Sequence, residues 1–304
     1  MNFQVLIDDS FINVCGDCLS PSHNKSVLSI VNDFEDGEWW YKNFHLFIWD
    51  NIAETSLSSK ERTSLIDRSA SLMSAAAENL RLVDKENDIS KGSELAEIML
   101  YGIMKHHYGA LPVVPKIFYK QNSQDNAKGA DSVHLVLHDN DFSLWFGEAK
   151  FYNSIENARL GGIIESVKNS LKTDKLKKEN SIITNINDLD DLILDVDLRN
   201  EIKNALSPKN SIDLLKSKIH IPIFILHECE TTSAATMMSP EYKRNIIEYH
   251  TERAKSFFEK QVVSLKDIHQ HEQITFHFIL FPVPNKSRIV DKFVKKVEFY
   301  KEEF

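Results

Sequence analysis

Asp131, Glu148 and Lys150 carry the strongest chemical signal in this 304-residue chain. Glu148 and Lys150 are two residues apart in the segment FGEAK, and side chains two apart on a β-strand project from the same face. Asp131 lies in the preceding apolar segment, GADSVHLVL. Two carboxylates offer the hard oxygen ligands that Mg²⁺ binds, and Mn²⁺ accepts similar ligands. We therefore predict that Asp131 and Glu148 hold a metal ion, while Lys150 holds an attacking water or stabilises charge in the transition state.

The two segments are expected to form a β-hairpin, and the position of its turn decides whether the three side chains meet. The turn falls within Asp139-Asn140-Asp141, whose residue types favour turns. A turn on the first two of these residues places Asp131 opposite Glu148, and a turn on the last two places it opposite Lys150. A turn centred on the middle residue places Asp131 opposite Ala149, on the other face of the sheet. Two of the three registers therefore bring the side chains into one site.

The pattern formed by the two acids and the lysine is short, and a surface hairpin of mixed charge often contains it by chance. Alone it is weak evidence for a site. The residues around the pair make it more informative. Trp145, Phe146 and Phe151 bracket Glu148 and Lys150, so the pair is expected on a half-buried strand. Charge is costly to bury without a partner, and a functional role would explain why it is there.

A helix is expected over residues 91–109, with apolar residues at helical spacing and Gly109 as its stop signal. Glu94 and Glu97 on this helix could each supply a further acid to the site. We prefer Glu97 as the additional catalytic and metal-binding acid, because it follows the small residue Ala96 and precedes the apolar Ile98. Both glutamates could also be plain solvent-facing residues.

A cluster of lysines follows the candidate site in the segment KNSLKTDKLKK. The chain has a formal net charge of -9, so an enzyme of nucleic acids would have to concentrate its positive charge locally. We predict that this cluster contacts nucleic-acid phosphates, the alternative being a solvated helix face. Its members are Lys168, Lys172, Lys175, Lys177 and Lys178.

The pattern of apolar residues predicts an α/β fold. From residue 91 onward the expected order is α, β, β, β, α, β, α, β, α. The strands are expected at 115–120, 132–139, 143–151, 220–228 and 274–283, and the later helices at 154–178, 240–265 and 286–300. Residues 1–80 are predicted to form a separate strand-rich elaboration for partner contact, with strands at 3–7, 27–31 and 44–50 and a helix at about 60–80. Residues 81–304 would then form the domain that carries the site.

The composition bounds the class of protein. Hydrophobic residues make up 42% and charged residues 27%, which is typical of a folded globular protein. Three cysteines are too few and oddly numbered for a disulfide framework. No stretch approaches the roughly 18 apolar residues of a membrane span, and the opening residues lack a secretory signal, so we expect a soluble, cytoplasmic protein. No phosphate-binding loop of the ATPase type is present, so any motor must be a partner.

The motif order resembles the core of the PD-(D/E)XK nuclease superfamily over roughly residues 91–180. That core has a helix with Glu, a strand beginning G-x-D, a strand with E-A-K and a lysine-bearing helix. The segments ELAEIMLYGIM, KGADSVHLVL and LWFGEAKFY are similar to the HamA family, the nuclease subunits of Hachiman anti-phage systems. Asp131, Glu148 and Lys150 match the nuclease motif and Glu97 is the less certain helix acid. The G-x-D lead, with Gly129 and Asp131, replaces the Pro-Asp of the motif's name and leaves the ligand in place.

This resemblance implies a restriction-endonuclease-like core, a mixed sheet flanked by helices. It also implies a Mg²⁺-dependent DNA endonuclease or nickase, restrained by a HamB-like helicase partner until phage infection disturbs the DNA. The absence of a recognisable base-reading module suggests that cutting is not sequence-specific.

Two other functions fit the sequence. A regulatory subunit could keep the nuclease fold and only bind a partner, which suits the acidic charge. The site could also hydrolyse another phosphodiester such as RNA, because the motif binds phosphate rather than bases. A half-buried Asp, Glu and Lys favour an enzyme over a binding module.

Overall fold

The computed structural model describes most of the chain. The described residues are 2–82, 92–115, 117, 130–138, 141–185, 189, 192–207 and 209–302.

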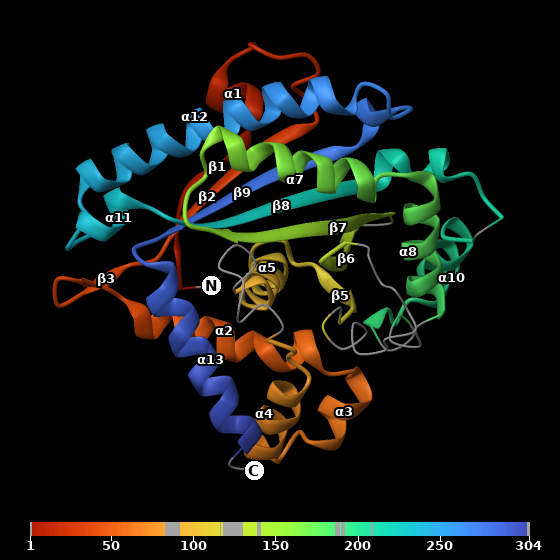
Figure 1. The fold of residues 1–304 in the computed structure, drawn as a ribbon. Helices are drawn as coiled ribbons and strands as arrows, with labels where there is room; N and C mark the ends of the chain where they lie inside the picture. The colour runs from red at the N-terminus through yellow and green to blue at the C-terminus, as the bar shows by residue number, and fades with distance from the viewer. Residues whose placement is uncertain are drawn as a thin grey trace.

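A seven-stranded mixed sheet forms the centre of the molecule (Figure 1). Four consecutive strands, β2, β9, β8 and β7, are parallel to one another. Antiparallel pairing adds β1 on one side, and β6 and then β5 on the other. In spatial order the strands are β1 (Gln4–Ser10), β2 (Lys25–Val31), β9 (Thr275–Val283), β8 (Ile219–Glu228), β7 (Asp141–Tyr152), β6 (Ser132–His138) and β5 (Leu111–Val114). The predicted α/β class with a mixed sheet is confirmed.

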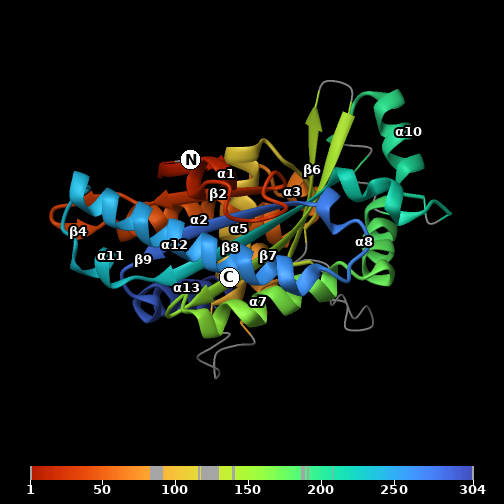
Figure 2. The same cartoon turned by 90° about the horizontal axis from the view of Figure 1, so that it is seen from above.

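Helices cover both faces of the sheet. One face is covered by α7 (Asn157–Ser170) and α12 (Pro240–Leu265), which lie side by side when seen from above (Figure 2). The other face is covered by α5 (Ser93–Tyr108), with α2 (Tyr41–Ser56) and α13 (Lys286–Glu302) beyond it (Figure 1). The inner strands are apolar on both sides because each face is buried. On β8, Ile223 and Ile225 join the core beneath α7 and α12, and Phe224 and Leu226 join the core on the α5 side.

Smaller elements complete the fold. They are α1 (Phe11–Cys15), β3 (Phe34–Glu35), β4 (Glu38–Trp39), α3 (Ser59–Ser64), α4 (Ser69–Glu78), α8 (Thr173–Asn185), α10 (Val196–Ala205), α11 (Glu230–Ala234) and the 3-10 helices Ile212–Lys218 and His271–Gln273. Within the described part of the chain, no helix combines the length and the apolar composition that a membrane crossing requires.

The elements around the candidate site form where the sequence predicts them. The helix at 91–109 is α5, with Gly109 in the left-handed conformation at its end. The hairpin is β6 and β7, and the later elements are β8, α12, β9 and α13. The predicted strand at 115–120 falls almost entirely outside the described residues.

The predicted strand at 44–50 is wrong, because these residues lie within α2. Phe44, Phe47, Ile48 and Ile52 are buried. Their spacing of three to four residues is that of a helix face, whereas the run of aromatic and β-branched residues suggested a strand. The single helix predicted for about 60–80 is also wrong, since the structure has two short helices there, α3 and α4.

The helix predicted at 154–178 is divided into α7 and α8. The break falls at Leu171, a buried residue that packs into the core. The hydroxyl of Ser170 donates to the Val167 carbonyl at 2.8 Å, satisfying an acceptor at the end of α7. The following Thr173 and Asp174 are typical of a helix start. This break sets the direction of the lysine-bearing segment.

The predicted boundary near residue 80 does not divide the sheet. β2 pairs with β9, a strand from the far end of the chain, and β1 pairs with β2. The first 80 residues therefore supply an edge of the central sheet as well as the helices beyond α5. Their role in partner contact stays a prediction.

Buried histidines link the layers. The side chain of Ser29 on β2 lies 2.7 Å from Nδ1 of His250 on α12, and Nε2 of His250 lies 3.0 Å from Nε2 of His227 on β8. Nδ1 of His227 lies 3.2 Å from the carbonyl oxygen of Glu228, which can only accept. Burial lowers the pKa of both rings well below the neutral range, so both are uncharged at pH 7. The proton positions then follow: His227 donates to the carbonyl, His250 donates to His227, and Ser29 donates to His250.

We predict that acid destabilises the fold through such buried imidazoles. Burial lowers the pKa of His227 to about 4 and that of His134 to about 3, whereas the unfolded chain takes up protons near pH 6.5. The unfolded state therefore binds more protons below pH 6.5, and the free energy of unfolding should fall as the pH drops from 6.5 towards 4. Each such histidine contributes up to about 1.4 kcal/mol per pH unit. Urea unfolding at several pH values measures this slope.

A substitution at His134 tests the cause. Both ring nitrogens of His134 are buried and have no hydrogen-bond partner among the described residues, so His134→Leu should raise stability and make the slope shallower. The exposed residue His269 provides the control, and His269→Gln should keep the wild-type slope. An unchanged slope in His134→Leu would contradict the prediction.

Candidate active site

Asp131 lies opposite Glu148 at the end of the hairpin away from its turn. Ser132 pairs with Gly147, which is the register of a turn on Asp139-Asn140. The backbone N–H of Asp131 donates to the Gly147 carbonyl at 2.7 Å. Of the three registers that the sequence allows, the structure has one that brings the side chains together.

Gly147 lets β6 and α5 approach the strand closely just before Glu148. A Cβ atom at this position would lie 2.2 Å from Oγ of Ser132 and 2.8 Å from Cδ2 of Leu100. No larger residue fits unless these neighbours move. The close packing fixes the position of β7 directly before Glu148.

The ammonium of Lys150 lies between the two carboxylates. Its Nζ atom is 2.6 Å from Oε1 of Glu148 and 3.3 Å from Oδ2 of Asp131. Oδ2 of Asp131 also accepts from the backbone N–H of Ala149 at 3.0 Å. The exposed fractions of the side chains are 8% for Glu148, 17% for Asp131 and 31% for Lys150, so the three charges are largely removed from water. Such a group is costly to bury, and its geometry must be supported.

The charges shift one another's pKa values. Burial raises the pKa of Glu148, and the Asp131 carboxylate raises it further, against the opposing effects of Lys150 and Ser166. Burial acts to lower the pKa of Lys150, but the two carboxylates outweigh it and raise that pKa above its ordinary value. Lys150 is therefore charged at neutral pH. With both carboxylates ionised, the three side chains together carry a formal charge of -1.

Two residues that sequence reasoning missed support the trio from the helices above. The hydroxyl of Ser166 on α7 donates to Oε1 of Glu148 at 2.6 Å. The carboxylate of Glu179 on α8 is buried and accepts from the backbone N–H of Ala130, next to Asp131, at 3.2 Å. Neither residue has a motif around it, because each acts between layers that are distant in sequence.

A pocket of about 400 Å³ opens above the trio. Its lining joins Asp131, Glu148 and Lys150 to residues of α7, α8 and the turn between them. Those residues are Ser166, Asn169, Ser170, Lys172 and Lys175.

The structure brings two of the five predicted lysines to this pocket, Lys172 and Lys175. Lys168 is half-buried on α7, and Lys177 and Lys178 are exposed on α8. These three are not part of the lining formed by the described residues. Their predicted contact with nucleic acid stays a prediction.

A family model for HamA matches residues 9–297 of the chain. The chain belongs to the HamA family. It is therefore a component of a Hachiman anti-phage defence system, which works with a partner. A search of curated proteins found no match.

In this HamA-family chain the acidic residues fit a divalent cation. Asp131 and Glu148 present carboxylate oxygens to one pocket, and the contacts described for Glu148 fall on Oε1 alone. The formal negative charge of the three side chains and their carboxylate oxygens favour such a cation. Asp131 and Glu148 would hold Mg²⁺ or Mn²⁺.

Glu97 is buried on α5, and the described lining of the pocket does not include it. Across the described part of the chain, no three His, Cys, Asp or Glu side chains are grouped closely enough to hold a metal ion together. The carboxylate of Glu94 accepts from the backbone N–H groups of Arg81 and Leu82 at 2.9 and 2.8 Å. Glu94 therefore fixes the segment before α5, and a role for Glu97 at the metal stays a prediction.

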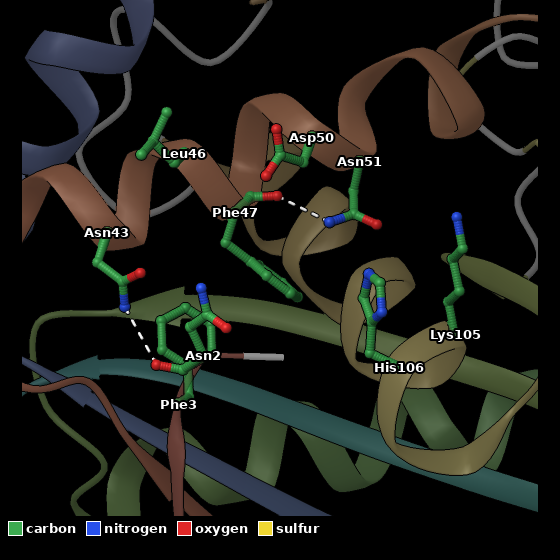
Figure 3. Close-up of a pocket in the computed structure, with 9 residues that line it drawn as sticks. All are labelled: Asn2, Phe3, Asn43, Leu46, Phe47, Asp50, Asn51, Lys105 and His106. Carbon is green, nitrogen blue, oxygen red and sulfur yellow. Dashed lines mark hydrogen bonds between the residues drawn. The ribbon is translucent and has the colours of Figure 1, made fainter.

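A second pocket, between α2 and α5, is a weaker candidate (Figure 3). Among the described residues that line it, Asp50 is the one carboxylate. The ammonium of Lys105 is engaged by Glu54 at 2.7 Å, and the amide of Asn51 donates to the Phe47 carbonyl at 2.8 Å. This lining lacks the paired acids that metal chemistry requires.

We predict that Ser166 positions Glu148 for metal binding in this HamA-family site. Ser166→Ala removes the hydroxyl that holds Oε1, so affinity for Mn²⁺ should fall by about tenfold, as is typical of groups that orient a ligand. Isothermal titration calorimetry with Mn²⁺ measures it. Ser170→Ala is the matched control, because Ser170 lines the same pocket but bonds to a backbone carbonyl. Equal affinity of Ser166→Ala and wild type, with binding lost in Glu148→Ala, would refute this role.

Proposed function

We propose that the chain is a Mg²⁺-dependent nuclease that hydrolyses DNA phosphodiester bonds as an effector of anti-phage defence. The observation that supports it most directly is the buried trio of Asp131, Glu148 and Lys150 at the base of a pocket whose rim bears Lys172 and Lys175. Acids for a metal, an ammonium for charge and lysines for phosphate are the groups that phosphodiester hydrolysis requires.

Each residue has a role that its contacts support. Asp131 and Glu148 would hold the metal ion. When bound, the ion would polarise the phosphate and lower the pKa of a bound water. Lys150 can orient the attacking water or stabilise the negative charge that develops on the phosphate, because its ammonium already lies at the carboxylates. Ser166 and the backbone N–H of Ala149 hold the carboxylates in place.

The rim of the pocket favours binding without base specificity. Lys172 is exposed and Lys175 is half-buried at the turn into α8. Ammonium groups attract phosphate whatever the base, so we propose that cutting is not sequence-specific. We also propose that a helicase partner restrains the nuclease, and that the substrate is DNA rather than RNA.

We predict that the trio is required for cutting. Incubation of the purified protein with supercoiled plasmid and Mg²⁺ should convert the plasmid to nicked or linear forms, and EDTA should prevent it. Glu148→Ala and Lys150→Ala should each slow cutting by at least about a hundredfold, because each removes charge that acts in the transition state. Gel electrophoresis over time measures the rates, with and without the helicase partner.

Glu165→Ala is the control for Glu148→Ala. Glu165 is an exposed carboxylate of α7 that contacts Asn169, so its loss should leave cutting unchanged. Cutting that survives in Glu148→Ala would exclude this site. No cutting of DNA or RNA under any condition would favour a binding subunit with a nuclease-like fold.

We also predict that the lysines of the pocket bind phosphate. Lys172→Ala with Lys175→Ala should weaken DNA binding and flatten its dependence on salt by about 0.7 to 0.9 in logarithmic slope for each lost phosphate contact. Lys177→Ala with Lys178→Ala changes the net charge equally but lies outside the described lining, so its effect should be smaller. Fluorescence anisotropy at several salt concentrations gives both slopes. Equal effects of the two double variants would contradict a specific role for the pocket.

A further inference from the structure

Tyr152 continues the row of side chains that Glu148 and Lys150 begin on β7. Residues two apart on a strand share a face and lie roughly 6.6 Å apart, so Tyr152 is the next side chain beyond Lys150. Its ring is half-buried against the core on the α7 side. Burial raises the pKa of Tyr152, and the charges of Lys150 and Glu148 act on it as well. The ring is therefore held at the edge of the site.

Arg159 lies over this ring from the first turn of α7. Its guanidinium carbon is 5.9 Å from the ring centroid of Tyr152, and its side chain is exposed. Within the described part of the chain it forms no ion pair with a carboxylate. An exposed arginine without an acidic partner is notable in a chain with a net charge of -9. Its charge is available to an anionic ligand.

We propose that Tyr152 and Arg159 form a subsite for the nucleotide next to the phosphate that is cut, and that this nucleotide is unpaired. The proposal rests on the nuclease function and names its substrate as a single strand or an unpaired segment. Aromatic rings stack on any base, and arginine binds phosphate and adds a cation–π contribution. The exposed guanidinium of Arg159 would move from the ring to a neighbouring phosphate, and the face of the Tyr152 ring that it leaves would receive the base.

The spacing and the size of the pocket support a single strand. The step from Lys150 to Tyr152 is comparable to the length of one nucleotide in an extended strand. A ring can stack only on a base whose face is exposed, and the bases of a duplex are covered by their neighbours. The pocket above the trio, at about 400 Å³ between sheet and α7, is of the size that takes one small ligand group.

The chemistry beyond Tyr152 limits the subsite to about one nucleotide. A separate pocket there is lined by the carboxylates of Glu156, Glu228 and Glu230. It also contains a tyrosine and an arginine, Tyr249 and Arg253, whose guanidinium lies 5.8 Å from the ring centroid. Arg253 contacts Glu252, and the surrounding acids would repel phosphate. The pair of Tyr249 and Arg253 thus resembles the pair of Tyr152 and Arg159 in geometry, but its surroundings are acidic.

Binding of a fluorescein-labelled oligothymidine and of a matched duplex tests the proposal. Fluorescence anisotropy with the full chain, in Ca²⁺ in place of Mg²⁺, measures both affinities without cutting. Tyr152→Ala should weaken single-strand binding by about tenfold, in line with the loss of one stacked base, and Tyr152→Phe should bind as wild type. Arg159→Ala should weaken binding and reduce the salt slope by about 0.7. Arg253→Ala should change neither.

The outcomes separate this proposal from the nuclease function. Unchanged single-strand binding in both Tyr152→Ala and Arg159→Ala would overturn the subsite, as would equal losses for single strand and duplex. Arg159 is exposed, so its variant keeps the test valid if Tyr152→Ala does not fold. A wild-type protein that cuts plasmid while these variants bind normally would leave the nuclease standing and remove the subsite. A wild-type protein that binds the oligothymidine through Tyr152 but never cuts would retain the subsite and remove the nuclease.

Discussion

The position of the Lys150 ammonium between two carboxylates is the constraint on which the rest of the site depends. Asp131 and Glu148 lie close together and largely out of water, where two like charges repel strongly. One ammonium compensates one of them, and the three side chains together keep a formal negative charge. That charge supports the proposal that a divalent cation binds here. An apolar replacement would satisfy packing, so the cost of burying these charges is consistent with function rather than stability.

The sheet provides the rigidity that this arrangement needs. β7 is parallel to β8 on one side and antiparallel to β6 on the other, so the strand that bears Glu148 and Lys150 is fixed along both edges. The antiparallel partner, β6, begins directly after Asp131. The pairing of β6 with β7 therefore brings Asp131 next to Glu148 and Lys150. α7 and α8 then supply Ser166 and Glu179 from above. The sheet, α7 and α8 therefore meet at the site. The contact from α7 holds Glu148, and the contact from α8 holds the backbone next to Asp131.

The sequence predicts the strand pair well and the supporting helices poorly, for a physical reason. Glu148 and Lys150 share a face because the strand period is two, and Asp131 joins them in two of three possible registers, so local rules nearly determine the trio. Choosing the register required the structure. Ser166 and Glu179 act across layers, and no local rule predicts which helix turn will lie over a strand. The same limit explains residues 44–50, whose aromatic run satisfied a strand pattern although their buried face is helical.

The charge distribution connects the site with the partner that Hachiman systems imply. The chain is acidic overall, while lysines gather along α7 and at its junction with α8, together with Arg159, which forms no ion pair among the described residues. A negative protein repels long stretches of DNA, and its local positive groups act at short range only. If the chain is the nuclease that we propose, it would be inefficient at capturing duplex DNA unaided. If the proposed subsite takes an unpaired strand, the proposed helicase partner would solve both problems, because it would concentrate DNA at the nuclease and separate the strands.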